Sequence, residues 1–224
     1  MKNKSQLFPD DYFEFRDLND KRRLQSFKLE VEWLKKSIPE LRGNICDVGC
    51  STGEMKAALK WKGNYFGMEI NKNAVIKAKQ RGISFECNIL NKRNFFDLII
   101  FRGTIQHIDN PFQYLSNAFH SLRDDGYMAI LATPNTDSLY YKIFNDLPAL
   151  DKEKSFYIPS FDHLNKLCMR EGFHLVSKMS PYIKSGYENP ILDFTKFFCR
   201  VLTRKKVFSG PFPGNMMNLL FKKA

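Results

Sequence analysis

The sequence predicts an α/β fold of the Rossmann-like, doubly wound type, and three observations lead to that class. Strand and helix signals alternate from about residue 41 to residue 134, the rhythm of parallel strands joined by crossover helices. A buried strand at 45–48 breaks into a glycine turn followed by a helix. A second strand, at 65–69, ends in an acid. Together these features predict a ligand site at the carboxyl edge of a mostly parallel sheet.

The turn after the first strand is the most informative local feature. Asp47 lies at the end of the strand, and Gly49 and Gly53 flank the turn as Gly-x-x-x-Gly. Glycine permits a tight turn and a close approach of the backbone to a ligand, because it has no Cβ. Glu69 stands twenty-two residues after Asp47, where a carboxylate can accept hydrogen bonds from both hydroxyls of a ribose. The pair of acids at successive strand ends indicates a nucleoside site, although the glycine spacing differs from Gly-x-Gly-x-x-Gly.

These residues resemble the motifs of class I S-adenosylmethionine (SAM) methyltransferases. The family's first motif matches 47–53, with Ser51 in place of the middle glycine, and its ribose-binding acid matches Glu69. The third motif, beside the adenine, matches 85–89. The resemblance implies a sheet of about seven strands with an antiparallel last strand, and SAM as cofactor with S-adenosylhomocysteine (SAH) as product. The residues it assigns to the cofactor in this part of the chain are Asp47, Gly49, Cys50, Ser51, Gly53, Glu69, Ile70, Asn88 and Ile89.

The segment after the fourth strand, 102–111, resembles that of ubiquinone-type O-methyltransferases. His107 follows the strand at the cofactor cleft, and the resemblance together with the near-neutral pKa of imidazole makes it the candidate general base. The alternatives are a residue that only orients the acceptor and a hydrogen-bonded structural histidine. Gln106 replaces the Glu usual in those relatives, and with Thr104 it supplies no carboxylate, so no metal is expected. Arg102 is expected to face cofactor and acceptor, and its alternative is a salt bridge.

The chain is expected to form a single methyltransferase domain over residues 1–224. Its parts are an N-terminal helical segment (1–40), a SAM-binding core (41–136) and two cap insertions (137–160 and 181–213). By resemblance, Tyr12, Arg16 and Arg23 meet the carboxylate of SAM, and the alternative for Arg16 and Arg23 is a solvated position.

The insertions should lie near the acceptor, which makes Tyr140 and Tyr157 substrate candidates beside Arg102, Gln106 and His107. Structural padding or a dimer surface is the alternative for the insertions.

Composition limits the partners. The net charge of +11 favours anionic partners, but no separate basic arm or RNA module is present, so no nucleic acid is expected. No transmembrane segment or signal peptide is evident, and the five cysteines show no metal-like spacing, so the expected location is the cytoplasm. The segment 194–206 mixes aromatic and basic residues, which suits either peripheral membrane contact or a helix that packs one face and solvates the other. The oligomeric state stays open.

The leading functional hypothesis is a SAM-dependent O-methyltransferase for a small, phosphorylated or nucleotide-linked acceptor. The resemblance extends to methyltransferases of bacterial capsule and O-antigen loci, which places the hypothesis in surface-polysaccharide biosynthesis. The alternatives are a ubiquinone-type phenol O-methyltransferase, an RNA methyltransferase and a non-catalytic SAM-binding protein. The glycine spacing and the lack of a Tyr-x-x-x-Lys pair argue against an NAD-dependent oxidoreductase.

Overall fold

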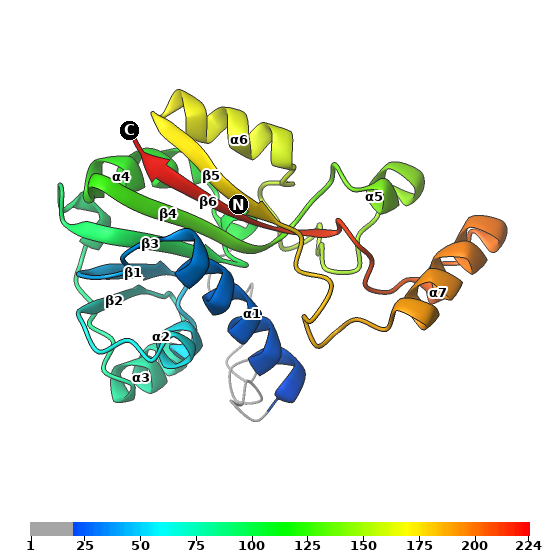
Figure 1. The fold of residues 1–224 in the computed structure, drawn as a ribbon, viewed down its shortest axis with the longest axis horizontal. Coiled ribbons are helices and arrows are strands. Elements are labelled where there is room, and N and C mark those ends of the chain that lie inside the picture. Colours follow the sequence, from blue (N-terminus) through cyan, green and yellow to red (C-terminus); the bar gives the residue numbers. More distant parts are fainter. Residues whose placement is uncertain (1–19) are drawn as a thin grey trace.

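A six-stranded sheet organises the part of the chain that the computed structural model describes, residues 20–224. The strand order is β2-β1-β3-β4-β6-β5. The strands are β1 (Ile45–Val48), β2 (Tyr65–Met68), β3 (Phe96–Arg102), β4 (Leu122–Pro134), β5 (Phe173–Met179) and β6 (Met216–Lys223). The first four pair in parallel, and β6 lies antiparallel between β4 and β5 (Figure 1). The predicted fold class and the antiparallel last strand are therefore confirmed.

The strand count is one fewer than the expected number of about seven. Ser84 forms a single parallel bridge with Phe66, and the chain then turns into the short 3-10 helix η3 (Ile89–Asn91). Asn88 adopts a left-handed backbone conformation with φ of 53°, which an extended strand does not allow. The third-motif segment 85–89 is therefore a turn rather than a strand.

Helices cover both faces of the sheet, as the alternation predicts. On one face the core contains α4 (Pro111–Ser121) and α6 (Phe161–Arg170). On the other it contains α1 (Lys21–Ser37), α2 (Glu54–Leu59) and α3 (Lys72–Gln80). Within β3, Leu98 and Ile100 belong to the second core, whereas Ile99 and Phe101 belong to the first. Successive side chains of a strand point to opposite faces, so an almost wholly apolar strand is what a sheet buried on both sides requires.

The two insertions pack on one another and form a cap with its own apolar core. Tyr140, from α5 (Leu139–Phe144), packs with Leu147, and these residues meet Phe197 of α7 (Pro190–Thr203) and Phe212. The rings of Phe197 and Phe212 are stacked with centroids 4.4 Å apart. Arg200 ties the two insertions together, because its guanidinium donates to the Tyr140 hydroxyl (2.7 Å) and to Asp146 (3.0 Å). In Figure 1 the cap extends away from the sheet, with α7 at its far end.

Candidate functional site

The turn after β1 is fixed by backbone hydrogen bonds to the end of β2. Gly49 and Cys50 both donate their N–H groups to the Met68 carbonyl, at 2.8 and 3.1 Å. Gly49 has φ of 76°, and a Cβ there would lie 2.4 Å from the Thr104 hydroxyl oxygen, so only glycine fits. The turn thus lies in contact with the segment that follows β3.

Glu69 follows β2 and holds the turn through its carboxylate. It accepts hydrogen bonds from the backbone N–H groups of Ser51 (3.0 Å), Ile70 (2.8 Å) and Asn71 (2.9 Å). Ile70 is 68% exposed although it is apolar, and it lines the same cavity as Ser51 and Glu69. An acid and an exposed apolar side chain therefore lie together at the carboxyl end of β2.

Asp47 lies beneath this wall, in the interior of the sheet. One carboxylate oxygen accepts a hydrogen bond from the Tyr65 hydroxyl at 2.9 Å, and the other is buried with no hydrogen-bond partner among residues 20–224. Burial raises the pKa of Asp47 to about 7, although the hydrogen bond from Tyr65 and the charge of Arg102 act in the opposite direction. Asp47 is thus placed to influence the electrostatic potential of the site from the interior of the sheet.

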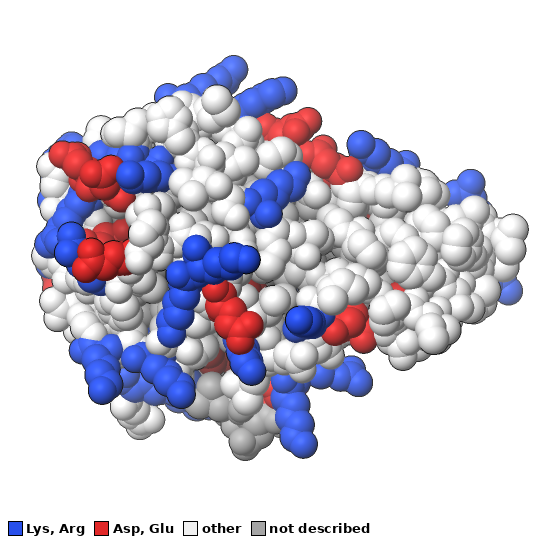
Figure 2. Space-filling model, viewed as in Figure 1, with Lys and Arg blue, Asp and Glu red and all other residues white. Residues whose placement is uncertain are grey.

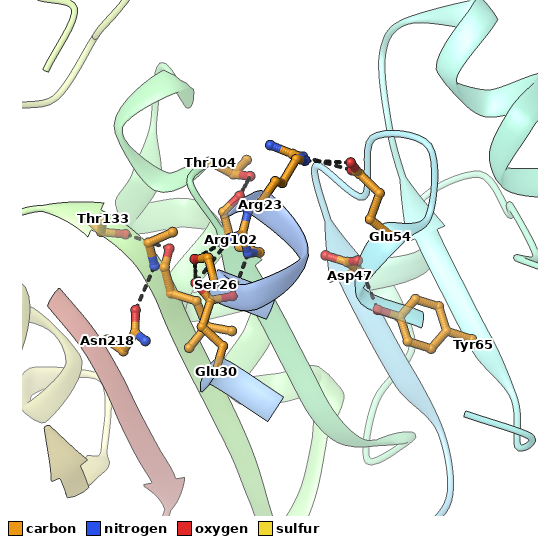
Figure 3. Close-up of polar contacts among 12 residues, drawn as sticks. Arg23, Ser26, Glu30, Asp47, Glu54, Tyr65, Arg102, Thr104, Thr133 and Asn218 are labelled. Atoms are coloured by element: carbon orange, nitrogen blue, oxygen red, sulfur yellow. Dashed lines mark hydrogen bonds and ion pairs between the residues drawn. The ribbon is translucent and has the colours of Figure 1, made fainter. Parts of the chain in front are cut away.

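Two ion pairs connect the helices to the cavity wall (Figure 3). Arg23 of α1 makes a bidentate contact with Glu54 of α2, at 2.6 and 2.9 Å. Arg102, at the end of β3, makes a bidentate contact with Glu30 of α1, at 2.6 and 3.1 Å. The Arg102 guanidinium also lies 3.7 Å from the centroid of the Phe27 ring. Since Glu30 and Glu54 are buried, each pair neutralises a cation at the wall.

A bulge in β4 completes the floor of the cavity. The register of β4 with β6 shifts between Ile130 and Thr133, and Ala132 takes φ of 47°. Its N–H donates to the side-chain oxygen of Asn218, a fully buried residue of β6, at 2.8 Å (Figure 3). This distortion brings Ala132 to the cavity wall beside Gly103.

His107 lies in the short 3-10 helix η4 (Ile105–His107) and lines the cavity. Its Nδ1 lies 3.0 Å from the carbonyl oxygen of Lys154, which can only accept, so we assign the proton to Nδ1. Nε2 then carries the lone pair and lies 3.3 Å from the amide nitrogen of Gln106. Burial lowers the pKa of His107, so the imidazole is neutral at pH 7 and able to accept a proton.

The cavity has a volume of about 1030 Å³, at the upper end of the usual range for small-molecule sites, and so has room for two ligands. One side of the wall comes from the sheet edge and from α1. The other comes from the cap and the segments that enter it, and contributes mainly apolar and aromatic residues, namely Pro148, Ala149, Pro181, Tyr182, Tyr187, Pro211, Phe212 and Met216.

The structure brings about half of the predicted site residues to this cavity. Those that line it are Gly49, Ser51, Glu69, Ile70, Arg23, Arg102 and His107. Tyr12 and Arg16 lie outside the described residues.

The cofactor candidates that do not line the cavity have packing roles. Cys50 is buried in the core beneath the turn. At Gly53, where φ is 89°, a Cβ would lie 2.7 Å from the Ile83 side chain. Asn88 is exposed and Ile89 is buried in the core.

The substrate candidates outside the cavity also have structural partners. Tyr140 belongs to the cap core and is almost fully buried, so we correct its placement to a structural one. The Tyr157 hydroxyl lies 3.0 Å from Nδ1 of His163. The backbone carbonyl of Gln106 accepts hydrogen bonds from the N–H groups of Phe156 and Tyr157, which anchors the first insertion beside His107.

Several wall residues were missed by the sequence reasoning. Phe85, Glu86 and Cys87 line the cavity in place of Asn88. Their signal was present, since an aromatic and an acid occur in the third-motif segment. Glu30 gave no such signal, because a helical glutamate usually faces solvent.

Neither a metal cluster nor a membrane span is found in the described part of the chain. No group of three or more His, Cys, Asp or Glu side chains within residues 20–224 could hold a metal ion. Over the same residues, no helix is both long and apolar enough to cross a bilayer.

Comparison with known proteins identifies the family. A family model described as a methyltransferase domain matches residues 12–178, about three quarters of the chain. The chain belongs to this methyltransferase family. A relative of this methyltransferase, the mitochondrial ubiquinone biosynthesis O-methyltransferase of Saccharomyces cerevisiae, is 28% identical over 107 residues. That match covers 42% of this chain and only 34% of the yeast protein.

Solved structures agree with the family at the level of the fold. A SAM-dependent methyltransferase from Thermotoga maritima superposes with a TM-score of 0.60 at 20% identity, covering 90% of this chain and 89% of that one. The magnesium protoporphyrin IX methyltransferase of Synechocystis PCC 6803, solved with bound SAH, gives a TM-score of 0.59 at 15% identity, covering 91% and 84%. The expected class, a SAM-dependent methyltransferase of class I, is therefore confirmed by family and fold together.

Proposed function

We propose that this methyltransferase transfers the methyl group of SAM to a hydroxyl oxygen of a small acceptor. The observation that carries the proposal is the presence of Glu69 and His107 on the wall of one cavity. The Glu69 carboxylate is held at the end of β2 by three backbone N–H groups, in position to accept from ribose hydroxyls, and the exposed Ile70 offers an apolar surface to adenine.

The charge of the cavity wall suits SAM. SAM carries one more positive than negative charge, because its sulfonium and ammonium groups outnumber its carboxylate. Among the described residues the wall has two cations, Arg23 and Arg102, both paired with buried carboxylates. It has four acids, namely Glu30, Glu69, Glu86 and Asp109. Glu30 is paired with Arg102, and Glu86 lies 2.6 Å from Lys92, so the excess of acids comes from Glu69 and Asp109. A cavity with an excess of acids attracts a cationic ligand.

His107 is proposed as the general base. The bound cofactor supplies an electrophilic methyl group on a positively charged sulfur. Nε2 of His107 can take the proton of the acceptor hydroxyl as the new bond to carbon forms, and the Nδ1 hydrogen bond to the Lys154 carbonyl stabilises the imidazolium that results. The rigid turn at Gly49 and the cap hold the two ligands in place, which lowers the entropic part of the barrier.

The same wall favours a neutral aromatic acceptor over a phosphorylated one. The net charge of +11 had suggested an anionic acceptor from surface-polysaccharide biosynthesis, but both described cations of the wall are already neutralised. The cap side is apolar and aromatic, and the yeast relative is a ubiquinone biosynthesis O-methyltransferase. We therefore place a phenolic acceptor first and a sugar phosphate or sugar nucleotide second.

Calorimetric titration with SAM, SAH and NADH tests the cofactor assignment. We expect micromolar binding of the sulfur nucleosides and none of NADH. Glu69→Gln should weaken SAM binding by about 1–3 kcal/mol, because charged hydrogen bonds are lost. Glu40→Gln, in an exposed ion pair with Arg42, is the matched control and should bind SAM as the wild type does. Unchanged affinity in Glu69→Gln would remove the cofactor assignment.

Radiolabelled methyl transfer to two acceptor panels, catechols and sugar phosphates, then separates the acceptor classes. Product from the phenols alone supports the proposal, whereas product from the phosphates alone would reverse the order given above.

A further inference from the structure

The helix α7 has an exposed apolar face that the cap does not cover. Its inner face buries Asp193, Phe197 and Arg200. On the opposite face, Ile191, Phe198 and Leu202 are 86%, 59% and 84% exposed. At about 100° per residue these three fall within one narrow strip, because they are spaced seven and four residues apart. We call them the α7 stripe. Of the two alternatives for residues 194–206, the helix that packs one face and solvates the other therefore does not describe α7, since this helix is apolar on two sides.

Basic residues precede and follow the stripe along the chain, and one of them, Lys206, lies 3.9 Å from Asp146. Lys184, Arg204, Lys205 and Lys206 are exposed, and Lys196 is partly exposed on the helix itself. Glu188 is partly exposed, while Asp193 is buried and accepts a hydrogen bond from the Tyr182 hydroxyl at 2.9 Å. In Figure 2 the lobe that carries α7 shows few charges on its surface, with Lys and Arg at its edge. An apolar strip bordered by cations matches an anionic lipid surface, which offers both phosphate charge and an apolar interior.

The stripe is continuous with the acceptor side of the cavity. Phe194, on the flank of the stripe, packs against Phe212 with ring centroids 5.0 Å apart, and Phe212 lines the cavity. Tyr187, just before the helix, also lines the cavity and is 44% exposed. A surface docked on α7 would thus lie close to the cap side of the cavity.

We propose that α7 docks this protein on an anionic membrane surface, with the α7 stripe in the headgroup region and the basic residues on lipid phosphates. A second copy of the chain fits less well, because a symmetric pairing through α7 would bring several like charges together, and Glu188 alone does not balance them. The proposal does not rest on the proposed function, since it concerns only the outer face of the cap.

Vesicle co-sedimentation of the full chain tests the proposal. The probe is vesicles of phosphatidylcholine alone or mixed with an equal part of phosphatidylglycerol. We expect binding to the anionic vesicles that weakens with added salt, and little binding to the neutral ones. The triple variant Ile191→Ser, Phe198→Ser, Leu202→Ser should bind the anionic vesicles at least about tenfold more weakly. Arg204→Gln with Lys205→Gln should weaken binding about fivefold for each charge removed.

The control replaces three exposed apolar residues outside the cap, Ile76, Met169 and Val176, with serine. This variant should bind anionic vesicles as the wild type does, and SAM titration of every variant verifies that the cavity is intact. Absence of binding by the wild type, or equal loss in the control variant, would overturn the proposal. So would a concentration-dependent dimer in analytical ultracentrifugation that the stripe variant abolishes, because it would assign the surface to self-association.

Discussion

On the sheet side of the cavity, backbone groups and buried ion pairs hold the wall, whereas on the cap side aromatic side chains do. The turn at Gly49 is fixed by N–H groups that bond the Met68 carbonyl, and Glu69 by three further N–H groups. The cap instead depends on the contacts of Tyr140, Phe197 and Phe212 around Arg200. Under the function proposed above, the sheet side would hold the cofactor with a rigid backbone frame, and the cap side would meet the acceptor with packed side chains.

The largest expected effect comes from removing His107, the proposed general base on the sheet side of the cavity. His107→Ala should lower kcat by about 10²–10⁴-fold, because the acceptor hydroxyl then loses its proton to water. SAM affinity should stay within about twofold, since no cofactor contact is assigned to this imidazole. Single-turnover kinetics and calorimetry measure the two quantities separately.

The control for this variant is His174→Ala, at an exposed position of β5 that is remote from the cavity wall. It should leave both quantities unchanged. A fall in SAM affinity equal to the fall in kcat would mean that His107 holds the site together rather than accepting a proton.

Weakening the contacts that hold the cap should have a smaller and more local effect on the enzyme than replacing His107. Arg200→Ala removes the donors to the Tyr140 hydroxyl and to Asp146, which should destabilise the cap by about 1–3 kcal/mol. Hydrogen exchange should quicken in 139–147 and 190–203 and stay slow in β1 and β3. KM for the acceptor should rise while SAM affinity holds.

Arg204→Ala, at an exposed position just beyond α7, is the control, and its exchange pattern should equal that of the wild type. Faster exchange spread over the whole sheet in Arg200→Ala would show that cap and sheet unfold as one unit, against the comparison.

The smallest expected effect lies at the junction of the two sides. Gln106→Glu places a carboxylate about where the amide nitrogen now lies, 3.3 Å from Nε2 of His107. A nearby negative charge favours imidazolium and so raises the pKa of His107, which burial lowers in the wild type. The base acts when neutral, so kcat/KM rises with pH through this pKa.

In Gln106→Glu that rising limb should lie at higher pH than in the wild type. If the pKa of His107 rises by about one unit, which is a tenfold gain in proton affinity, kcat/KM on the acid side of the limb falls about tenfold. NMR titration of the His107 ring gives the pKa directly. Gln113→Glu, at an exposed position of α4, is the control, and an equal change there would indicate a general effect of added charge.

The sheet side could be predicted from the sequence because its features are local. Glycines at fixed spacing and a strand followed at once by Glu69 each act within a few residues. The place of Asn88 outside the cavity wall has an equally local cause, since Asn88 takes a left-handed backbone conformation that composition does not reveal. Glu86 and Cys87, which line the cavity, therefore lie just before Asn88, the residue that the resemblance assigns to the cofactor.

The contacts inside the cap and the partners of the ion pairs could not be predicted, because these partners are far apart in the chain. Arg102 meets Glu30 across seventy-two residues, and Arg200 meets Tyr140 across sixty. An aromatic residue in a predicted lid has the same composition signal whether it faces a ligand or, like Tyr140, a core. Only the packing distinguishes the two.

The lone bridge at Ser84 has a consequence for how this sheet meets other proteins. β2 is an outer strand, and such strands can recruit a strand from a foreign chain when their amides and carbonyls are free. Ser84 donates to the Tyr65 carbonyl at 2.9 Å, and its own carbonyl accepts from the Gly67 amide at 2.9 Å. Ser84 thus pairs with the outward-facing carbonyl of Tyr65 and the outward-facing amide of Gly67, in a strand of only four residues. These two groups are therefore not available to an edge strand from another chain, and aggregation through this edge is disfavoured.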